Sequence, residues 1–264
     1  MSVLSRLLNV APAESGFVGE ASGPPDKRAY GGHLAAQAMA AACHTVDADK
    51  AHRVHVQFLR GGDAGAPVHY EVEYVYDGRT TASRRVLARQ EGRLLTAATV
   101  SFSAAADGPE HAAQATTSGE PEQLPATGPI GPAPSLPLDE IDIRTDDDRS
   151  TGEFVRRLWW RVTVPLDGPA WLGACAAVYV TDIYGIDPVL QVHGHSMVDR
   201  SHRTATTDSS IWFHRPIHAE QWNLLESRSP AAARGRGLVT LNLYDADRIL
   251  TATLVQEGLA IVRT

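Results

Sequence analysis

An internal repeat limits the possible folds of this chain more than any other feature. Residues 93–100 read RLLTAATV, and residues 248–255 read RILTATLV, at an offset of 155 residues. Agreement at one offset over roughly forty residues indicates a duplicated unit. The same offset also matches other identical residues: Phe58 with Phe213, Arg60 with Arg215 and Arg79 with Arg234.

A proline-rich segment separates the two halves. Residues 103–138 carry seven prolines among many Ala, Ser, Thr and Gly residues. Proline lacks an N–H donor and fixes its own φ, so this segment cannot form a helix or a central strand. We therefore expect an N-terminal domain at 1–104, a linker at 105–138 and a C-terminal domain at 139–264.

Each half is predicted to hold one buried helix and several strands. His33 to Val46 (HLAAQAMAAACHTV) is apolar around most of its circumference, as in a helix buried on most sides. Residues 68–77 alternate apolar and polar side chains like a half-buried strand, and a hairpin signal, Asp77-Gly78, follows. Further strands are expected near 80–90, 93–103, 154–163, 209–216, 222–229, 236–245 and 248–262, with a second helix near 170–190. This order predicts an α+β fold in which antiparallel sheet wraps round a central helix.

Composition disfavours several classes of function. A hydrophobic content of 43% with 21% charged residues is typical of a globular protein. The net charge of −7 disfavours nucleic acid as a partner. No apolar stretch approaches the about 20 residues of a membrane span, so no membrane insertion is expected. Cys43 and Cys175 lie in Ala-rich surroundings and do not indicate a disulfide framework, so we expect a cytoplasmic location.

Short motifs occur in order along both halves. The first half carries Tyr30-Gly31-Gly32-His33, Phe58-Leu59-Arg60 with Gly62-Asp63, Asp77-Gly78, Ser83-Arg84-Arg85-Val86 and Ser101-Phe102. The second half carries Thr181-Asp182, Ala205-Thr206-Thr207-Asp208, Trp212-Phe213-His214-Arg215-Pro216 and Val255-Gln256-Glu257-Gly258. Together these motifs resemble the acyl-CoA thioesterase II family of tandem hotdog domains. The family usually has Gln in place of His33 and an aliphatic residue in place of Thr207.

The resemblance implies both a fold and a reaction. The fold is a double hotdog of the α+β class, with two antiparallel sheets each wrapped round a central helix. The reaction is hydrolysis of fatty acyl-CoA to free fatty acid and CoA. It also implies acyl-CoA as the bound partner and a homodimer as the assembly.

The resemblance places the catalytic residues on Asp182, Thr206 and Gln256. Asp182 lies in an apolar stretch, AAVYVTDI, where a carboxylate is costly unless it is hydrogen-bonded or functional. It could orient a water or accept its proton, while Thr206 and Gln256 hold that water in place. At the offset of 155, Thr206 falls on Ala51 and Gln256 on Ser101, so we expect one site per chain, formed mainly by the second half.

Gly31, Gly32 and His33 are predicted to bind the substrate. Backbone N–H groups at a helix N-terminus are free donors, and glycine permits close approach, so one of the two glycines would polarise the thioester carbonyl. Each residue also has an ordinary structural alternative. The glycines could simply form the turn into the helix, His33 could be a core residue, and Asp182 could be a helix cap.

Neither a metal nor an organic cofactor is expected. The chain has no Gly-x-Ser-x-Gly motif, so direct attack by water is favoured over a serine nucleophile. His193, His195 and His202 are interpreted as a polar loop rather than a zinc site. Trp159 and Trp160 are expected to pack rather than to line an acyl tunnel. Two alternatives remain open: a hotdog enoyl-CoA hydratase or dehydratase, and a non-catalytic acyl-CoA-binding module.

Overall fold

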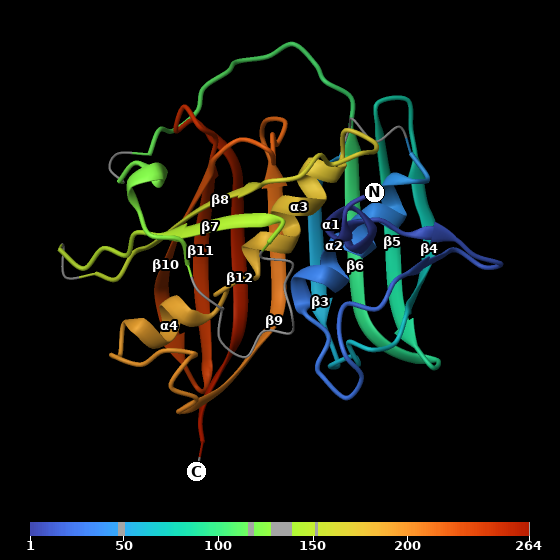
Figure 1. Ribbon diagram of the computed structural model, residues 1–264. Coiled ribbons are helices and arrows are strands. Elements are labelled where there is room, and N and C mark those ends of the chain that lie inside the picture. Colours follow the sequence, from blue (N-terminus) through green and yellow to red (C-terminus); the bar gives the residue numbers. More distant parts are fainter. Residues whose placement is uncertain (47–50, 116–118, 128–138, 151–152, 264) are drawn as a thin grey trace.

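The computed structural model describes residues 1–46, 51–115, 119–127, 139–150 and 153–263. These residues form a twelve-stranded antiparallel sheet with the two longest helices packed against one of its faces (Figure 1). The strands of the first half lie side by side at one end of the sheet, and those of the second half at the other. The predicted α+β fold with a duplicated antiparallel sheet and central helices is therefore confirmed.

The two halves join edge to edge in the middle of the sheet. β3 and β9 pair antiparallel there, which makes the two predicted sheets continuous. Outward from this junction, each half repeats the same succession of strands, with extra edge strands beyond. The order is β1 (Ala11–Pro12), β2 (Phe17–Gly19), β4 (Val68–Asp77), β5 (Thr81–Gln90), β6 (Arg93–Ser103), β3 (Ala51–Phe58), β9 (His202–Phe213), β12 (Leu250–Val262), β11 (Arg236–Tyr244), β10 (Asn223–Ala233), β8 (Arg156–Val162) and β7 (Ile141–Thr145).

The strand repeat follows the offset seen in the sequence, with one local change. β4 and β10 begin at Val68 and Asn223, which are 155 residues apart. In the β3–β6 ladder, however, Val54 lies opposite Val100, whereas its counterpart Ser209 lies opposite Gln256 in the β9–β12 ladder. The register of β12 is therefore displaced by one residue relative to β6. As a result, the first-half residue at the position of Gln256 is not the one that the sequence offset gives.

The helices differ from the prediction at their ends. α2 (Gly31–Cys43) begins two residues before the predicted start, and a short α1 (Val3–Leu8) precedes it. The second predicted helix is split into α3 (Leu172–Thr181) and α4 (Asp187–Gln191). The split occurs because Tyr184 adopts a left-handed φ of 60°, which an α-helix cannot continue through. Among the described residues, no helix is long and apolar enough to cross a bilayer.

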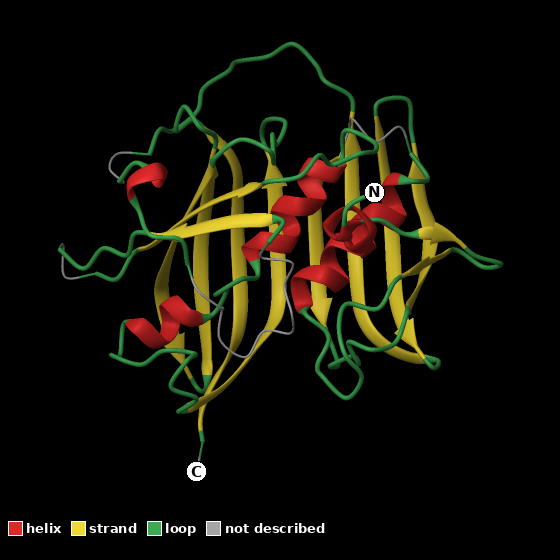
Figure 2. Ribbon diagram, in the orientation of Figure 1, coloured by secondary structure: helices red, strands yellow, loops and turns green. Residues whose placement is uncertain are grey.

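α2 and α3 pack antiparallel against each other (Figure 2). At one end of the pair, the Tyr30 hydroxyl donates a hydrogen bond of 2.6 Å to the Tyr179 carbonyl. At the other end, the rings of His44 and Trp171 meet edge to face at 5.1 Å between centroids. The many buried alanines of α2 allow the two backbones to approach closely. This packing brings the N-terminus of α2 to the C-terminus of α3.

Two further predictions can be compared with the second half. β9 begins at His202, seven residues before the predicted start at 209, because the polar run of threonines pairs with the end of β12. Trp159 and Trp160 are both buried on β8 and pack in separate hydrophobic clusters, as predicted. The described part of residues 105–138 holds one short 3-10 turn, η2 (Pro121–Gln123), and isolated bridges to neighbouring segments.

Candidate active site

A β-bulge brings Thr206 and Gln256 onto the same face of the sheet. Gln256 lies opposite Ser209, but two positions later Gly258 lies opposite Thr206 rather than Thr207. Thr207 is therefore the extra residue of the bulge. Since successive strand residues point to opposite faces, this one insertion turns Thr206 toward the face that carries Gln256.

The Asp182 carboxylate accepts hydrogen bonds from three separate elements. It lies at the end of α3, where Thr206 Oγ1 and Gln256 Nε2 each donate to its Oδ1 at 2.7 Å. The Gly32 N–H, in the first turn of α2, donates to its Oδ2 at 3.0 Å. Gln256 Nε2 is also 2.8 Å from Thr206 Oγ1, so the three side chains form a closed triangle. Hydrogen bonds thus join four of the six predicted site residues.

Burial dominates the electrostatics of Asp182. Loss of solvent raises the pKa of its carboxyl above the usual value, because the charged form is poorly solvated there. Hydrogen bonds from Thr206, Gln256 and Gly32, followed by the positive charge of Arg28, oppose this shift without cancelling it. A carboxylate with a raised pKa accepts protons more readily than an exposed one, which suits a general base.

Two glycines leave space for the Asp182 carboxylate and for the Gln256 amide. A Cβ on Gly31 would lie 2.6 Å from Asp182 Oδ2 and 3.2 Å from Cε1 of Phe58. A Cβ on Gly185 would lie 2.6 Å from Gln256 Nε2. Both positions therefore exclude any side chain unless the polar group moves. Gly31, like Gly32, therefore borders the carboxylate, and its N–H donates to none of the described residues.

The first half has the same bulge without the polar residues. Ala51 lies opposite Phe102 and Arg53 opposite Ser101, which leaves His52 as the extra residue. By strand register, Ala51 occupies the position of Thr206, as predicted. The sequence offset matched Gln256 to Ser101, and this is corrected: the register assigns its position to the buried, apolar Val100. Within the described residues, the hydrogen-bonded triangle occurs only in the second half.

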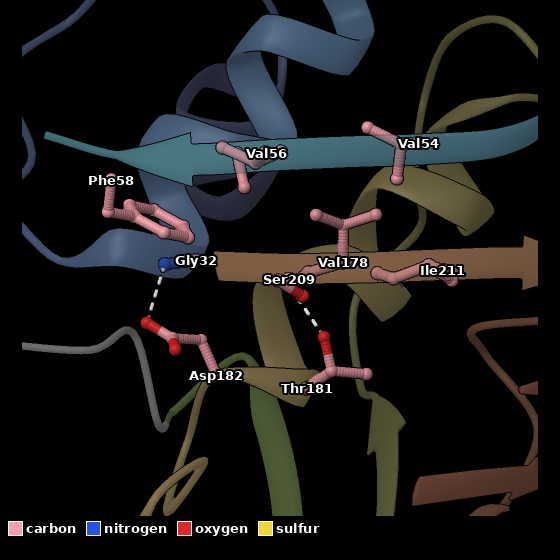
Figure 3. A pocket seen from close by; sticks show the side chains of 10 residues that line it. Gly32, Val54, Val56, Phe58, Val178, Thr181, Asp182, Ser209 and Ile211 are labelled. Carbon is pink, nitrogen blue, oxygen red and sulfur yellow. Dashed lines mark hydrogen bonds between the residues drawn. The ribbon is translucent and has the colours of Figure 1, made fainter. Parts of the chain in front are cut away.

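A small cavity lies beside Asp182, between the helices and the central strands (Figure 3). Its volume of about 10 Å³ is close to the room that one water needs. Polar groups at its wall come from Asp182, Thr181, Ser209 and the backbone of Gly32. The rest of the wall is apolar: Ala35, Val54, Val56, Phe58, Val178 and Ile211.

His33 does not belong to this group of residues. Its side chain is 1% exposed, and neither ring nitrogen reaches a hydrogen-bond partner among the described residues. Burial lowers the pKa of His33 to about 4, against a smaller opposing effect of the Leu7 carbonyl. The ring is therefore neutral near pH 7, and it does not line the cavity beside Asp182. Of the three predicted substrate-binding residues, the structure brings only Gly31 and Gly32 to the carboxylate.

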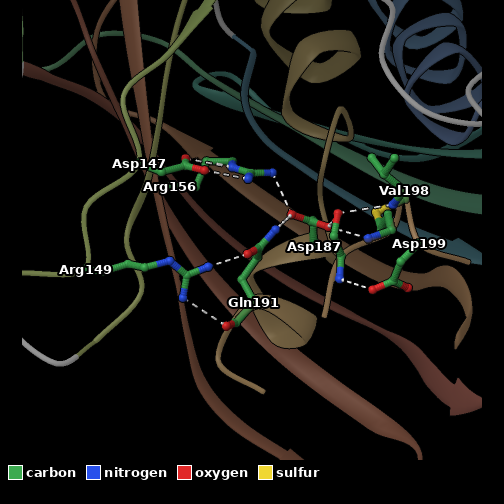
Figure 4. Close-up of polar contacts among 9 residues, drawn as sticks. Asp147, Arg149, Arg156, Asp187, Gln191, Val198 and Asp199 are labelled. Carbon is green, nitrogen blue, oxygen red and sulfur yellow. Dashed lines mark hydrogen bonds and ion pairs between the residues drawn. The ribbon is translucent and has the colours of Figure 1, made fainter. Parts of the chain in front are cut away.

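A buried ion network anchors the segment that follows α3 (Figure 4). Arg156 on β8 contacts Asp187, the first residue of α4, and Asp147, each at 2.7 Å. Asp187 is 1% exposed and also accepts a hydrogen bond of 3.0 Å from Gln191. These contacts fix α4, and with it the turn in which Gly185 packs against the amide of the site.

Two histidines of the second half lie close together near a carboxylate. The rings of His195 and His202 lie 4.9 Å apart, and His195 Nδ1 is 3.7 Å from Asp199 Oδ2. Over the described ranges, no group of three or more His, Cys, Asp or Glu side chains is arranged to hold a metal ion.

Three contributors to the site were not predicted from the sequence. Tyr30 holds the two helices together, Gly185 makes room for Gln256, and Arg28 adds positive charge near Asp182. Tyr30 belongs to the motif that precedes α2, so its position in that motif was an available signal. The other two depend on how distant segments pack, which no local pattern in the sequence indicates.

Comparison with known protein families identifies the family of this chain. Residues 20–103 match the model of an acyl-CoA thioesterase N-terminal domain, and residues 106–260 match that of an acyl-CoA thioesterase C-terminal domain. The second match alone spans more than half of the chain.

Individual relatives agree with these matches. Human acyl-coenzyme A thioesterase 8 is 28% identical over 99% of this chain and 89% of its own length. The crystal structure of the acyl-CoA thioesterase II TesB2 from Mycobacterium marinum superposes with a TM-score of 0.83 at 28% identity, covering 99% of each chain. A protein of unknown function with a hotdog fold from Alicyclobacillus acidocaldarius superposes with a TM-score of 0.78 at 20% identity, covering 100% of each chain, which supports the fold alone.

Proposed function

The chain belongs to the acyl-CoA thioesterase family, and from this premise we propose that it hydrolyses fatty acyl-CoA by direct attack of water activated at Asp182. Its products are the free fatty acid and CoA. The observation that carries the proposal is the half-buried Asp182 carboxylate, which accepts hydrogen bonds from Thr206, Gln256 and Gly32 on three other elements. A carboxylate whose pKa is raised by loss of solvent is costly to the fold, which favours a functional role for it.

Asp182 serves as the general base in this proposal. It removes a proton from water while the water oxygen attacks the thioester carbonyl carbon. As the carbon–sulfur bond breaks, the proton passes from Asp182 to the departing CoA thiolate, so the carboxylate is regenerated. Thr206 and Gln256 orient the carboxylate and the water, since both can donate and accept hydrogen bonds. The small cavity beside Asp182 supports a position for a single water there.

A backbone N–H at the start of α2 polarises the carbonyl. The Gly32 N–H donates to Asp182 Oδ2, whereas the Gly31 N–H donates to none of the described residues. We therefore assign the carbonyl oxygen to the Gly31 N–H, at the positive end of the helix dipole. The absence of a side chain on Gly31 leaves the substrate carbonyl free to approach.

Thiol release from acyl-CoAs of increasing length, from C4 to C18, tests this function. The parent should hydrolyse at least part of the series, and Asp182→Asn should lower kcat by about 10²–10⁴, the usual contribution of a general base. Gln256→Ala should also lower kcat. Asp208→Asn is the matched control, because this half-exposed carboxylate on β9 pairs with His55 instead of joining the triangle. A parent inactive on every length would exclude the proposed function, and parent-level activity in both site variants would exclude the assigned residues.

The same series separates the two alternatives. A hydratase would consume the double bond of an enoyl-CoA without releasing thiol. A binding module would bind acyl-CoA but would neither hydrate the double bond nor hydrolyse the thioester. The resemblance also leads us to propose a homodimer, which light scattering of the eluting protein would distinguish from a single chain.

A further inference from the structure

A second and larger hollow opens near the site. Its volume of about 410 Å³ lies within the range of small-molecule sites. Three segments form its walls: the loop before α2, the residues after β3, and the turn between β5 and β6. Its charged residues are Lys27, Arg28, Arg60 and Arg93, together with Asp26, Asp63 and Glu91.

Two features connect the hollow to the site at Asp182. Arg28 lines the hollow, and its charge acts on the Asp182 carboxyl. Arg60 also lines it and follows Phe58 by two residues, while Phe58 lines the small cavity beside Asp182. A ligand with its thioester at Asp182 could therefore extend into the hollow.

The cations of the hollow are available to bind a ligand. Lys27, Arg28, Arg60 and Arg93 are exposed, and none of them forms an ion pair or a side-chain hydrogen bond with a described residue. Of the three carboxylates, that of Asp63 already accepts a hydrogen bond of 2.8 Å from the Gly65 N–H. The net charge of the hollow is only slightly positive. Binding would therefore depend on individual guanidinium groups rather than on a general field.

The corresponding place in the second half is occupied by the chain itself. Arg248 matches Arg93 in the repeat, but it forms an ion pair of 2.6 Å with Glu120. The backbone of Ala115 also donates to the Arg248 carbonyl at 3.0 Å. The segment between the two halves thus covers this turn, whereas the equivalent turn of the first half borders the open hollow.

We propose that this hollow binds the phosphate groups of the CoA portion of the substrate, with Arg60 and Arg93 as two of the residues that contact them. The proposal rests on the proposed function, which supplies CoA as the ligand. Guanidinium groups bind phosphate oxygens through paired, charge-assisted hydrogen bonds. Arg60 and Arg93 act on binding alone, since the reacting carbonyl lies at Asp182.

The test compares two thioesters that differ only in the phosphate-bearing portion: an acyl-CoA and the matching acyl-pantetheine. The variant is Arg60→Gln combined with Arg93→Gln. The matched control is Arg215→Gln, the exposed repeat counterpart of Arg60 in the second half. The double variant should raise KM for acyl-CoA about tenfold or more with kcat little changed, as expected for lost binding in both the ground and transition states. Its kcat/KM for acyl-pantetheine, and both constants of Arg215→Gln, should match the parent.

Each outcome either supports or excludes the proposed phosphate subsite. An unchanged KM for acyl-CoA in the double variant would overturn the subsite, and so would an equal rise for both thioesters. If the parent hydrolyses neither thioester, the proposed function fails, and equilibrium binding of adenosine 3′,5′-bisphosphate to the same proteins decides the subsite. Weaker binding in the double variant but not in Arg215→Gln would support it. Equal binding by all three would exclude it.

Discussion

The Asp182 carboxylate, in the second half of the chain, accepts a hydrogen bond of 3.0 Å from the backbone N–H of Gly32 in the first half. This contact exists because α2 and α3 pack antiparallel, which places the start of one helix at the end of the other. The site therefore needs both halves, although the side chains of the triangle all come from the second. The duplication supplies both of these halves within a single chain.

The acid side of the pH–rate profile should reflect Asp182. Because the base must be ionised, kcat/KM should fall as the pH drops through the pKa of Asp182, which is raised above the ordinary value of an aspartate. Thr206→Val removes a hydrogen bond that lowers this pKa, so its acid limb should lie at higher pH than that of the parent. Thr207→Val, at the bulge, is the matched control and should retain the parent profile. An acid limb that does not move in Thr206→Val would contradict the role of Asp182.

Ionisation of the Asp182 carboxyl should also lower the free energy of unfolding, although the same ionisation is needed for catalysis. Since its folded pKa is raised, the native state favours the protonated form, and this contribution to stability is lost as the pH rises through the folded pKa. Asp182→Asn cannot ionise. The free energy of unfolding of the parent, relative to this variant, should therefore fall as the pH rises from about 4, the ordinary pKa of an aspartate, through the raised pKa, by about 1.4 kcal/mol for each pH unit between the two. Urea unfolding of both proteins across this range measures the difference, and a constant difference would contradict the raised pKa.

Gly31→Ala should impair catalysis more than stability. The new Cβ would lie 2.6 Å from Asp182 Oδ2, so the carboxylate or the helix start must shift. Displacing a reacting group by about 1 Å can cost about 10²-fold in rate, so a fall in kcat of that order is expected. Gly108→Ala provides the control, because a Cβ at that position would meet no described atom within 4 Å. Thiol-release assays and thermal unfolding of the two variants separate the effects; normal activity in Gly31→Ala would contradict the close approach.

Arg156→Met should destabilise the fold around α4. It leaves the buried Asp187 carboxylate without its cation, which typically costs about 3–5 kcal/mol. Arg161→Met on the same strand should cost no more than about 1 kcal/mol, since its ion pair with Asp142 is longer, at 3.6 Å, and more exposed. Urea unfolding distinguishes the two cases, and equal losses would show that the buried pair contributes no more than the exposed one.

Most of the architecture could be predicted because the duplication is visible at the level of strands. The hairpin at 77–78 is a local pattern that appears where predicted, whereas the half-buried alternation along 68–77 holds only as far as Val72, because Tyr74 and Tyr76 are exposed. The split between α3 and α4 was missed, since an apolar run looks helical whether or not Tyr184 turns left-handed. The displaced register of β12 was missed as well, because a strand pattern does not reveal which partner residue lies opposite.

The site could be predicted in composition but not in geometry. Family resemblance indicated Asp182, Thr206 and Gln256, while the alternation of strand residues alone would place Thr206 and Ser209 on opposite faces. The bulge at Thr207 reverses that expectation and has no signature in this sequence. His33 was predicted to bind the substrate from its position at the start of the helix, with a core position as the alternative, and its side chain is buried in the core.

Single-turnover hydrolysis in H₂¹⁸O, followed by mass spectrometry of the fatty acid and of the protein, tests direct attack by water most directly. With enzyme in excess over a hydrolysable acyl-CoA, we expect ¹⁸O in the released fatty acid, no acyl adduct on the quenched protein and no label in the peptide that carries Asp182. A protein mass increased by the acyl group, or ¹⁸O in that peptide, would mean that Asp182 is a nucleophile and would contradict its role as a general base.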